Sequence, residues 1–271
     1  GLFPFLVPFS GRLYFEAMRN AVRRTENIGN SDWICFDGAF MATMVFDIET
    51  TAQPIDNFDE AQQEYLFPEA ENQPRSDIAH FFGLWPLTGQ IVCIGMLNPQ
   101  TARGKALYLS EDFEDESSPD EEIEYVAYPD EADLLAHFWE LALKFDSVVT
   151  FNGRNFDIPY LYLRSALLNI PITRKNWLGY RFSDAPHCDL LEQLTFYGAG
   201  GRMGACRPFN LDFYCKAFGI PSPKAQGVTG SDVTQMIQEG RFRQIAEYCI
   251  RDVHATAELY KIWKERLSVE R

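Results

Sequence analysis

Short apolar runs alternate with amphipathic segments along most of the chain, and this pattern predicts a series of strands and helices. Three runs have the length and composition of buried strands: MVFDIET (44–50), QIVCIGML (90–97) and SVVTFN (147–152). Residues 105–110 alternate between apolar and polar side chains, and we expect them to form a hairpin with 90–97 through a turn around Gly104. HCDLL (187–191) is predicted to be a further short strand.

Helical periodicity dominates the second half of the chain. Six apolar side chains lie on one face of the predicted helix 130–145, namely Leu134, Leu135, Phe138, Leu141, Ala142 and Phe145. Further helices are predicted at 156–169, around 209–218 and over roughly 240–266. Because strands come first and then alternate with helices, we expect an α/β fold with a mixed central sheet. Two polar, proline-containing stretches, about 51–77 and 111–124, are predicted to be loops.

The composition is that of an ordinary globular protein. The 271 residues are 46% hydrophobic and 23% charged, which excludes dominant disorder and a small disulfide-rich scaffold. Residues 1–40 differ from the rest because they have no clean period and carry a small basic patch. We therefore expect an N-terminal appendage of unknown role over 1–40 and one folded domain over 41–271.

The net charge of −15 argues at first against a nucleic-acid partner, since phosphate binding depends on Lys and Arg. The acids are unevenly placed, however. The stretch 111–124 holds nine acids and no base, and removing those nine negative charges from −15 leaves −6. The overall charge therefore does not exclude an enzyme that acts on nucleic acid.

The six cysteines form no CxxC pair and have no zinc-like spacing. This is typical of free thiols in a reducing compartment, so we expect a cytoplasmic protein. The apolar run near the N-terminus is too short to cross a bilayer and is interrupted by Pro4 and Pro8, so we expect no membrane association.

Two carboxylates interrupt the first apolar strand. Residues i and i+2 of a strand point to the same face, so Asp47 and Glu49 are expected to project together. Their charges repel each other unless a cation is bound. A frayed strand end with two solvated acids is the simpler alternative.

Three further polar residues follow at element boundaries. Asp157 comes after the strand 147–152 and just before a proline, where it is either a functional acid or the N-cap of the next helix. Tyr248 and Asp252 lie four residues apart and therefore share one face of the final helix. They border its apolar stripe, a position that suits cleft-lining residues and ordinary boundary residues equally.

Taken together, these motifs resemble the tyrosine branch of the DEDD exonuclease superfamily. Its pattern of DxE, N-x4-D and Y-x3-D matches FDIET, FNGRNFDIPYL and EYCIRDVHAT in this chain. The segments LLEQLTFYGA, LDFYCKAFGIP and GSDV are similar to bacterial 3′–5′ exonucleases related to the proofreading domain of family-B DNA polymerases. The histidine branch would have His at position 247, which is Glu247 here. The resemblance covers roughly 42–263.

The resemblance implies a ribonuclease H-like fold of about five strands and a metal-dependent 3′–5′ exonuclease that acts on single-stranded DNA. Its catalytic residues would be Asp47, Glu49, Asp157, Tyr248 and Asp252. The four acids would hold two divalent cations, Mg²⁺ or Mn²⁺: Asp47 would bridge both, Glu49 and Asp252 would complete the first site, and Asp157 would hold the second. Tyr248 would stay protonated and orient the metal-bound water. Carboxylate oxygens are also the ligands that hard cations prefer.

Residues that flank the acids are candidates for holding a frayed 3′ end by stacking and backbone contacts. They are Thr50, Asn152, Asn155 and Phe156. Four cationic residues are candidates for phosphate contacts: Arg154, Arg202, Arg207 and Lys224. We expect His80, His137 and His187 to be structural or solvent-facing.

Two alternatives remain open. The same acids serve exoribonucleases, so the substrate strand is RNA instead of DNA in the first alternative. In the second, the chain is an inert scaffold that binds nucleic acid or a protein, which the complete set of acids disfavours. A protein partner would have the acidic stretch 111–124 or the N-terminal segment 1–40 to dock on.

Overall fold

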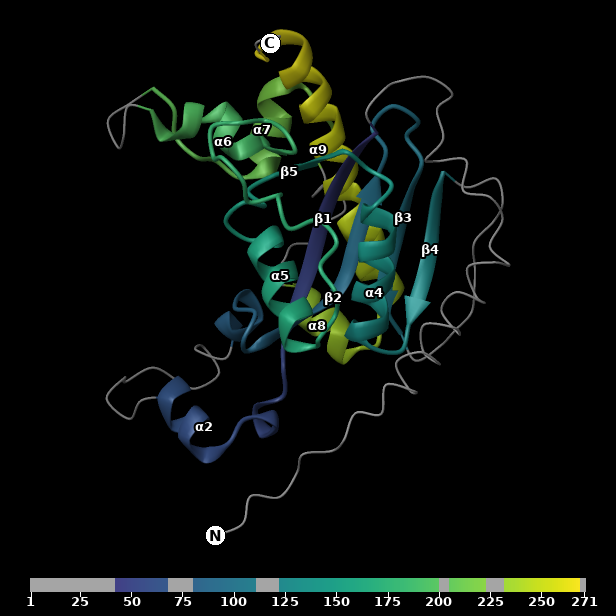
Figure 1. Ribbon diagram of the computed structural model, residues 1–271, viewed down its shortest axis with the longest axis vertical. Coiled ribbons are helices and arrows are strands. Elements are labelled where there is room, and N and C mark those ends of the chain that lie inside the picture. The colour runs from purple at the N-terminus through teal and green to yellow at the C-terminus, as the bar shows by residue number, and fades with distance from the viewer. Residues whose placement is uncertain (1–41, 68–79, 111–121, 200–204, 223–231, 269–271) are drawn as a thin grey trace.

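The computed structural model of the protein describes residues 42–67, 80–110, 122–199, 205–222 and 232–268 (Figure 1). The predicted appendage 1–40 and most of the acidic stretch 111–124 lie outside the described residues. The division of the chain near residue 41 therefore stays a prediction.

A six-stranded mixed sheet forms the centre of the fold. In sheet order, its strands are β4 (Ile123–Tyr128), β3 (Gly104–Leu109), β2 (Gly89–Leu97), β1 (Thr43–Ala52), β5 (Ser147–Thr150) and β6 (His187–Asp189). The β1–β2 and β2–β3 pairs are antiparallel, and the other pairs are parallel. The predicted mixed α/β fold is confirmed, with six strands where about five were expected.

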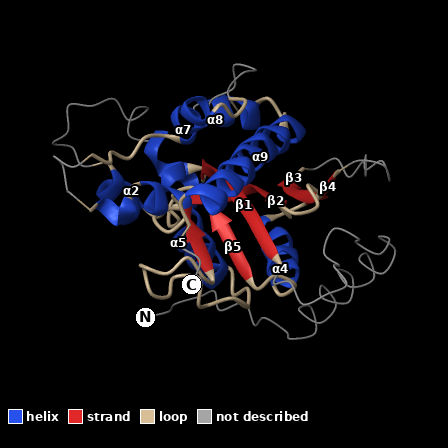
Figure 2. Ribbon diagram, turned by 90° about the horizontal axis from the view of Figure 1, so that it is seen from above, coloured by secondary structure: helices blue, strands red, loops and turns tan. Residues whose placement is uncertain are grey.

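Helices cover both faces of this sheet (Figure 2). The helices are α2 (Glu60–Leu66), α4 (Glu131–Ala142), α5 (Asp157–Leu167), α6 (Leu190–Leu194), α7 (Leu211–Phe218), α8 (Asp232–Gln238) and α9 (Phe242–Arg266). The helices predicted at 130–145, 156–169, 209–218 and 240–266 are thus confirmed as α4, α5, α7 and α9. No helix among the described ranges combines the length and apolar character that a membrane span requires.

Alternation along β1 divides the core into two halves. Val45 packs against the α9 side of the sheet, together with Cys93 of β2. Its neighbours Phe46 and Ile48 pack on the opposite side, where α4 and α5 lie. Because Asp47 and Glu49 follow Val45 at intervals of two, they share the face that α9 covers.

Three local predictions were wrong. The acidic stretch was expected to be loop up to residue 124, but β4 begins at Ile123 and pairs with β3. The hairpin between β2 and β3 turns at Asn98–Arg103, so Gly104 is the first residue of a strand. The stretch 51–77 contains the short 3₁₀-helix Ile55–Asn57 and α2.

Hydrophobic periodicity does not predict α2, because this helix is stabilised by an N-terminal capping box and has no apolar stripe. Asp59 accepts a hydrogen bond from the backbone N–H of Gln62, and the Gln62 side chain accepts one from the Asp59 N–H. This reciprocal capping box satisfies two backbone donors that the first turn of a helix leaves open. No residue of α2 is buried, so hydrophobic periodicity had nothing to detect.

Candidate active site

The acids of β1 lie on the face of the sheet against which α9 packs. Asp47 is opposite Gly95 of β2 in the antiparallel register. A Cβ at Gly95 would come within 2.9 Å of the Cys249 sulfur on α9, so the missing side chain is what permits the helix to approach. The Cys249 thiol in turn donates to the backbone carbonyl of Asp47 at 3.5 Å. The helix is thereby fixed directly over the first acid of the DxE motif.

Tyr248 and Asp252 lie on the part of α9 that faces these acids. The phenol of Tyr248 lies within electrostatic range of Asp252, Glu49 and Asp47. Only 4% of Tyr248 is exposed, so it lies deeper than the boundary position expected from the helix pattern. Asp252 is partly buried.

Asp157 is buried and is the first residue of α5, not its N-cap. The N-cap position is taken by Phe156, which makes no side-chain cap. The Asp157 carboxylate instead accepts a hydrogen bond from the backbone N–H of Ile48 at 3.1 Å. The alternative in which Asp157 only caps its helix is therefore wrong, because its carboxylate points at β1 between Asp47 and Glu49.

Burial and mutual repulsion raise the pKa values of these acids. Burial is the main cause of the increase in the pKa of Asp47 and of Glu49, both well above the usual range, and the charges of the neighbouring acids add to it. Burial also raises the pKa of Asp157 to about 7, although hydrogen bonds from the backbone N–H groups of Asp157 itself and of Ile48 oppose the increase. Burial and the nearby carboxylates raise the pKa of Tyr248 further above its ordinary value, so the phenol keeps its proton at neutral pH.

This donor set fits a hard divalent cation. Asp47, Glu49, Asp157 and Asp252 influence one another electrostatically, and a bound cation would relieve the repulsion that raises their pKa values. One possible ligand atom each from Asp47, Glu49 and Cys249 lie within 4.8 Å of one another. Burial raises the pKa of the Cys249 thiol well above its usual value, and a neutral thiol is a poor ligand. The ligand atoms that this site offers are therefore carboxylate oxygens, which hard divalent cations prefer.

The predicted substrate contacts lie at two places beside the acids. Asn152 and Asn155 are in the loop before α5, where the Asn155 amide donates to the Asn152 side-chain oxygen at 3.0 Å. Phe156 is partly buried, with its ring 5.4 Å from that of Tyr160. The Thr50 hydroxyl donates to the carbonyl of Gly83 at 2.7 Å, so its oxygen is held by the 3₁₀-helix η2 (His80–Leu84).

The two described cationic residues that were expected to contact phosphates already have partners within the protein. The Arg154 guanidinium lies 3.4 Å from the Glu192 carboxylate and donates to the carbonyl of Gly179. Arg207 stacks over the ring of Phe209. Arg202 and Lys224 lie outside the described residues.

His187 of β6 and His137 of α4 have structural contacts. His187 is buried, and its Nε2 is 2.8 Å from the Thr150 hydroxyl oxygen. Burial lowers the pKa of His187 to about 3, so the ring is neutral. His137 pairs with the phenol of Tyr128, and burial lowers its pKa to about 4. The side chain of His80 lies outside the described residues.

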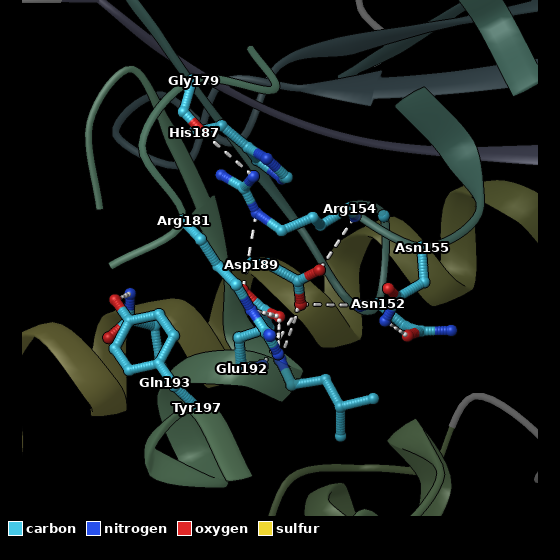
Figure 3. A network of polar contacts seen from close by, with 12 residues as sticks. Asn152, Arg154, Asn155, Gly179, Arg181, His187, Asp189, Glu192, Gln193 and Tyr197 are labelled. Atoms are coloured by element: carbon cyan, nitrogen blue, oxygen red, sulfur yellow. Dashed lines mark hydrogen bonds and ion pairs between the residues drawn. The ribbon is translucent and has the colours of Figure 1, made fainter. Parts of the chain in front are cut away.

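One acidic residue close to the site had no role in the sequence analysis. Asp189 ends β6 and joins a polar network with Asn152, Arg154 and Glu192 (Figure 3). The segment HCDLL was assigned only as a strand. Like Asp47, Asp189 is an acid within a predicted strand, and this is the signal by which the sequence could have identified it.

Two family models match the sequence. The model described as "Predicted 3'-5' exonuclease related to the exonuclease domain of PolB" matches residues 120–265. The model described as "DNA polymerase family B, exonuclease domain" matches residues 22–182. Each match spans more than half of the chain.

Similar proteins are much longer than this chain. DNA polymerase 1 of Saccharolobus solfataricus is 29% identical over 138 residues, which are 48% of this chain and 15% of that protein. DNA polymerase 1 of Sulfolobus acidocaldarius is 28% identical over 160 residues, which are 55% of this chain and 17% of that protein. The chain thus spans less than a fifth of the length of these relatives.

A solved structure has the same fold. The family B DNA polymerase from the hyperthermophilic archaeon Pyrobaculum calidifontis matches 84% of this chain with a TM-score of 0.51 and 16% identity, over 25% of its own chain. This likeness concerns the fold alone, and it confirms the expected ribonuclease H-like architecture.

Proposed function

Because the chain belongs to the family of 3′-5′ exonucleases related to the exonuclease domain of family-B DNA polymerases, we propose that it removes nucleotides from the 3′ end of single-stranded DNA. The family model fixes the class of activity. The strand type and the roles of individual residues are our proposals.

The convergence of four acids and one tyrosine from three distant segments carries this proposal. Asp47 and Glu49 come from β1, Asp157 from the start of α5, and Tyr248 and Asp252 from α9. An inert scaffold has no need to hold carboxylates so close together, since their repulsion destabilises the fold. The intact set therefore supports a hydrolase over a binding scaffold.

The four acids are proposed to hold two divalent cations, Mg²⁺ or Mn²⁺. When bound, such ions supply charge stabilisation for the attacking and leaving oxygens of phosphodiester hydrolysis. Asp47 and Glu49 would bind from the sheet, Asp252 from the helix above it, and Asp157 from the start of α5 at the edge of β1. The raised pKa of Tyr248 keeps its phenol protonated, so that it donates a hydrogen bond within the site.

The substrate assignment to DNA rests on the relatives. The proteins similar to this chain are named DNA polymerases. Thr50, Asn152, Asn155 and Phe156 surround the acids and are proposed to contact the terminal nucleotides. Base stacking on Phe156 would be tolerant of sequence, as a nuclease that degrades any 3′ end requires.

The test is a time course on a 5′-labelled single-stranded DNA oligonucleotide with Mg²⁺, Mn²⁺ or EDTA. We expect a ladder that shortens from the 3′ end, is lost with EDTA and is lost in the Asp47→Ala/Glu49→Ala variant. Glu60→Gln, an exposed acid on α2, is the matched control and should retain full activity. A matched RNA oligonucleotide shows whether the substrate is DNA or RNA. Shortening of RNA alone would support an exoribonuclease. No shortening of either strand would contradict a nuclease function.

A further inference from the structure

A single buried carboxylate, that of Asp189, holds the loop that leads into α5. Its Oδ1 accepts hydrogen bonds from the backbone N–H groups of Asn152 at 3.0 Å, Leu191 at 3.0 Å and Glu192 at 3.4 Å. Its Oδ2 accepts one from the backbone N–H of Arg154 at 2.9 Å. Two of these donors belong to the first turn of α6, which Asp189 caps, and two belong to the loop after β5 (Figure 3).

Capping of α6 explains only two of the four hydrogen bonds that Asp189 accepts. An N-cap carboxylate bonds the second or third N–H of its own helix, which here are the contacts to α6. The bonds to Asn152 and Arg154 cross 37 and 35 residues of sequence to another loop. Their effect is to fix the backbone five and three residues before Asp157.

Backbone hydrogen bonds within the loop connect these two positions to Asp157. The carbonyl of Asn152 accepts the N–H groups of Asn155 at 3.1 Å and of Phe156 at 3.2 Å. The carbonyl of Gly153 accepts the N–H of Ile158 at 2.9 Å. Asp157 lies between these bonded residues, so a shift of the loop would move its carboxylate.

The conformation of this loop also depends on contacts from outside the loop. Asn152 has a φ of 68°, in the left-handed region that few residues with a side chain adopt. Gly153 is packed so tightly that a Cβ would lie 2.3 Å from the Thr150 hydroxyl oxygen. Contacts from outside the loop help to keep this conformation, and Asp189 supplies two of them.

We propose that Asp189 is a positioning residue of the exonuclease site, which sets the place of Asp157 and of the candidate substrate residues Asn152 and Asn155 through the backbone of their loop. This proposal rests on the proposed function for its effect on hydrolysis. Its effect on the placement of Asp157 is independent of the substrate. Outer residues that orient metal ligands affect metal affinity or activity by about 10- to 100-fold.

The test compares Asp189→Asn with Glu192→Gln. In Asp189→Asn, the side-chain NH₂ group replaces the oxygen that accepts from Arg154, so two donors face each other. Glu192 is the matched control because it is a buried carboxylate three residues further on, whose partners are the side chains of Arg154 and Arg181. Mn²⁺ binding is measured without substrate, by the loss of the free-ion electron paramagnetic resonance signal, and kcat and KM are measured on a DNA oligonucleotide.

We expect Asp189→Asn to fold, to raise the Mn²⁺ dissociation constant about 10-fold and to lower kcat by at least as much, with a smaller change in KM. Glu192→Gln should bind Mn²⁺ as the wild type does. Unchanged Mn²⁺ binding in Asp189→Asn would overturn the proposal, as would equal weakening in both variants. If the wild type binds Mn²⁺ but cleaves neither DNA nor RNA, the proposed function fails and the Mn²⁺ comparison still decides the role of Asp189.

Hydrogen exchange of the unaltered protein gives a second test that does not depend on a variant folding. The Asn152 and Arg154 amides should exchange as slowly as those of β5, because both are bonded to Asp189. The Asn155 amide bonds only within the loop, to the Asn152 carbonyl, and its residue is exposed, so it should exchange faster. Equally fast exchange at all three positions would show that Asp189 does not hold the loop and would overturn the proposal.

Discussion

The carboxylate of Asp157 accepts the backbone N–H of Ile48, the residue between Asp47 and Glu49. The neighbouring strand β5 pairs with β1 only as far as Val45 and ends at Thr150. Beyond that point the edge of β1 needs another acceptor, and the start of α5 supplies it. One acid of the site is thus hydrogen-bonded to the strand that carries two others, so the three carboxylates keep their relative places.

This bond predicts different behaviour of two Asp157 variants. Asp157→Asn keeps an oxygen for the Ile48 N–H and removes a negative charge from the cluster, so it should match or exceed the wild type in melting temperature in EDTA. Asp157→Ala leaves a buried N–H unpaired, which costs about 1–3 kcal/mol of unfolding free energy. Both should lose about 100- to 1000-fold in kcat. Urea denaturation and single-turnover cleavage check the two effects, and equal stability of the variants would contradict the importance of the bond.

The raised pKa of Asp157 predicts a pH dependence of stability. The folded group has a pKa of about 7, against 3.8 ordinarily, so between these values the folded protein binds a proton that the unfolded chain has released. The wild type in EDTA should therefore lose stability relative to Asp157→Asn as the pH rises from about 4 to about 7, and the difference should level off above that. Mg²⁺ should reverse the loss because it favours the deprotonated acids.

Calorimetric melting of both proteins at several pH values, with and without Mg²⁺, measures this difference. A constant gap between wild type and Asp157→Asn across the range would mean that the pKa of Asp157 is not raised in the folded state.

Tyr248→Phe should separate catalysis from metal binding. The substitution removes the phenol hydroxyl beside Asp252 and keeps the buried ring, so we expect unchanged Mn²⁺ affinity and a loss of about 100-fold in kcat. Tyr162→Phe is the control, because the Tyr162 phenol bonds the carbonyl of Arg174 and should matter little for cleavage. Full activity of Tyr248→Phe would contradict the proposed role of Tyr248.

The ion pair between Glu131 and Arg164 should be important for stability. It joins α4 to α5 at 2.6 Å, and Glu131 also accepts the backbone N–H of Ile91 at 2.8 Å. Both side chains are less than a tenth exposed, so Glu131→Ala leaves a buried charge without its partner and should cost about 3–5 kcal/mol. Glu258→Ala, which breaks the exposed pair with Lys261, should cost less than about 1 kcal/mol. Urea denaturation of the two variants measures the difference, and similar losses would contradict it.

The sequence by itself determined the local parts of this protein. The apolar runs located five of the six strands, and periodicity located the long helices. The alternation of β1 placed Asp47 and Glu49 on one face, and the spacing of four placed Tyr248 and Asp252 together on α9. These features follow from backbone periods of 2 and 3.6 residues, which act within a single element. Strand β4 was not predicted because most of its residues are only half-buried and follow a run of acids, so its apolar pattern is weak.

Only the tertiary structure decided how these parts meet. The sequence left open whether Asp157 caps its helix, and the answer depends on the Ile48 N–H, which is 109 residues away along the chain. The role of Asp189 depends in the same way on two backbone amides of a distant loop. Periodicity tells which way a side chain points, but it does not tell which donor or acceptor of another element the fold brings to that point. The site therefore became defined only when β1, α5 and α9 were packed together.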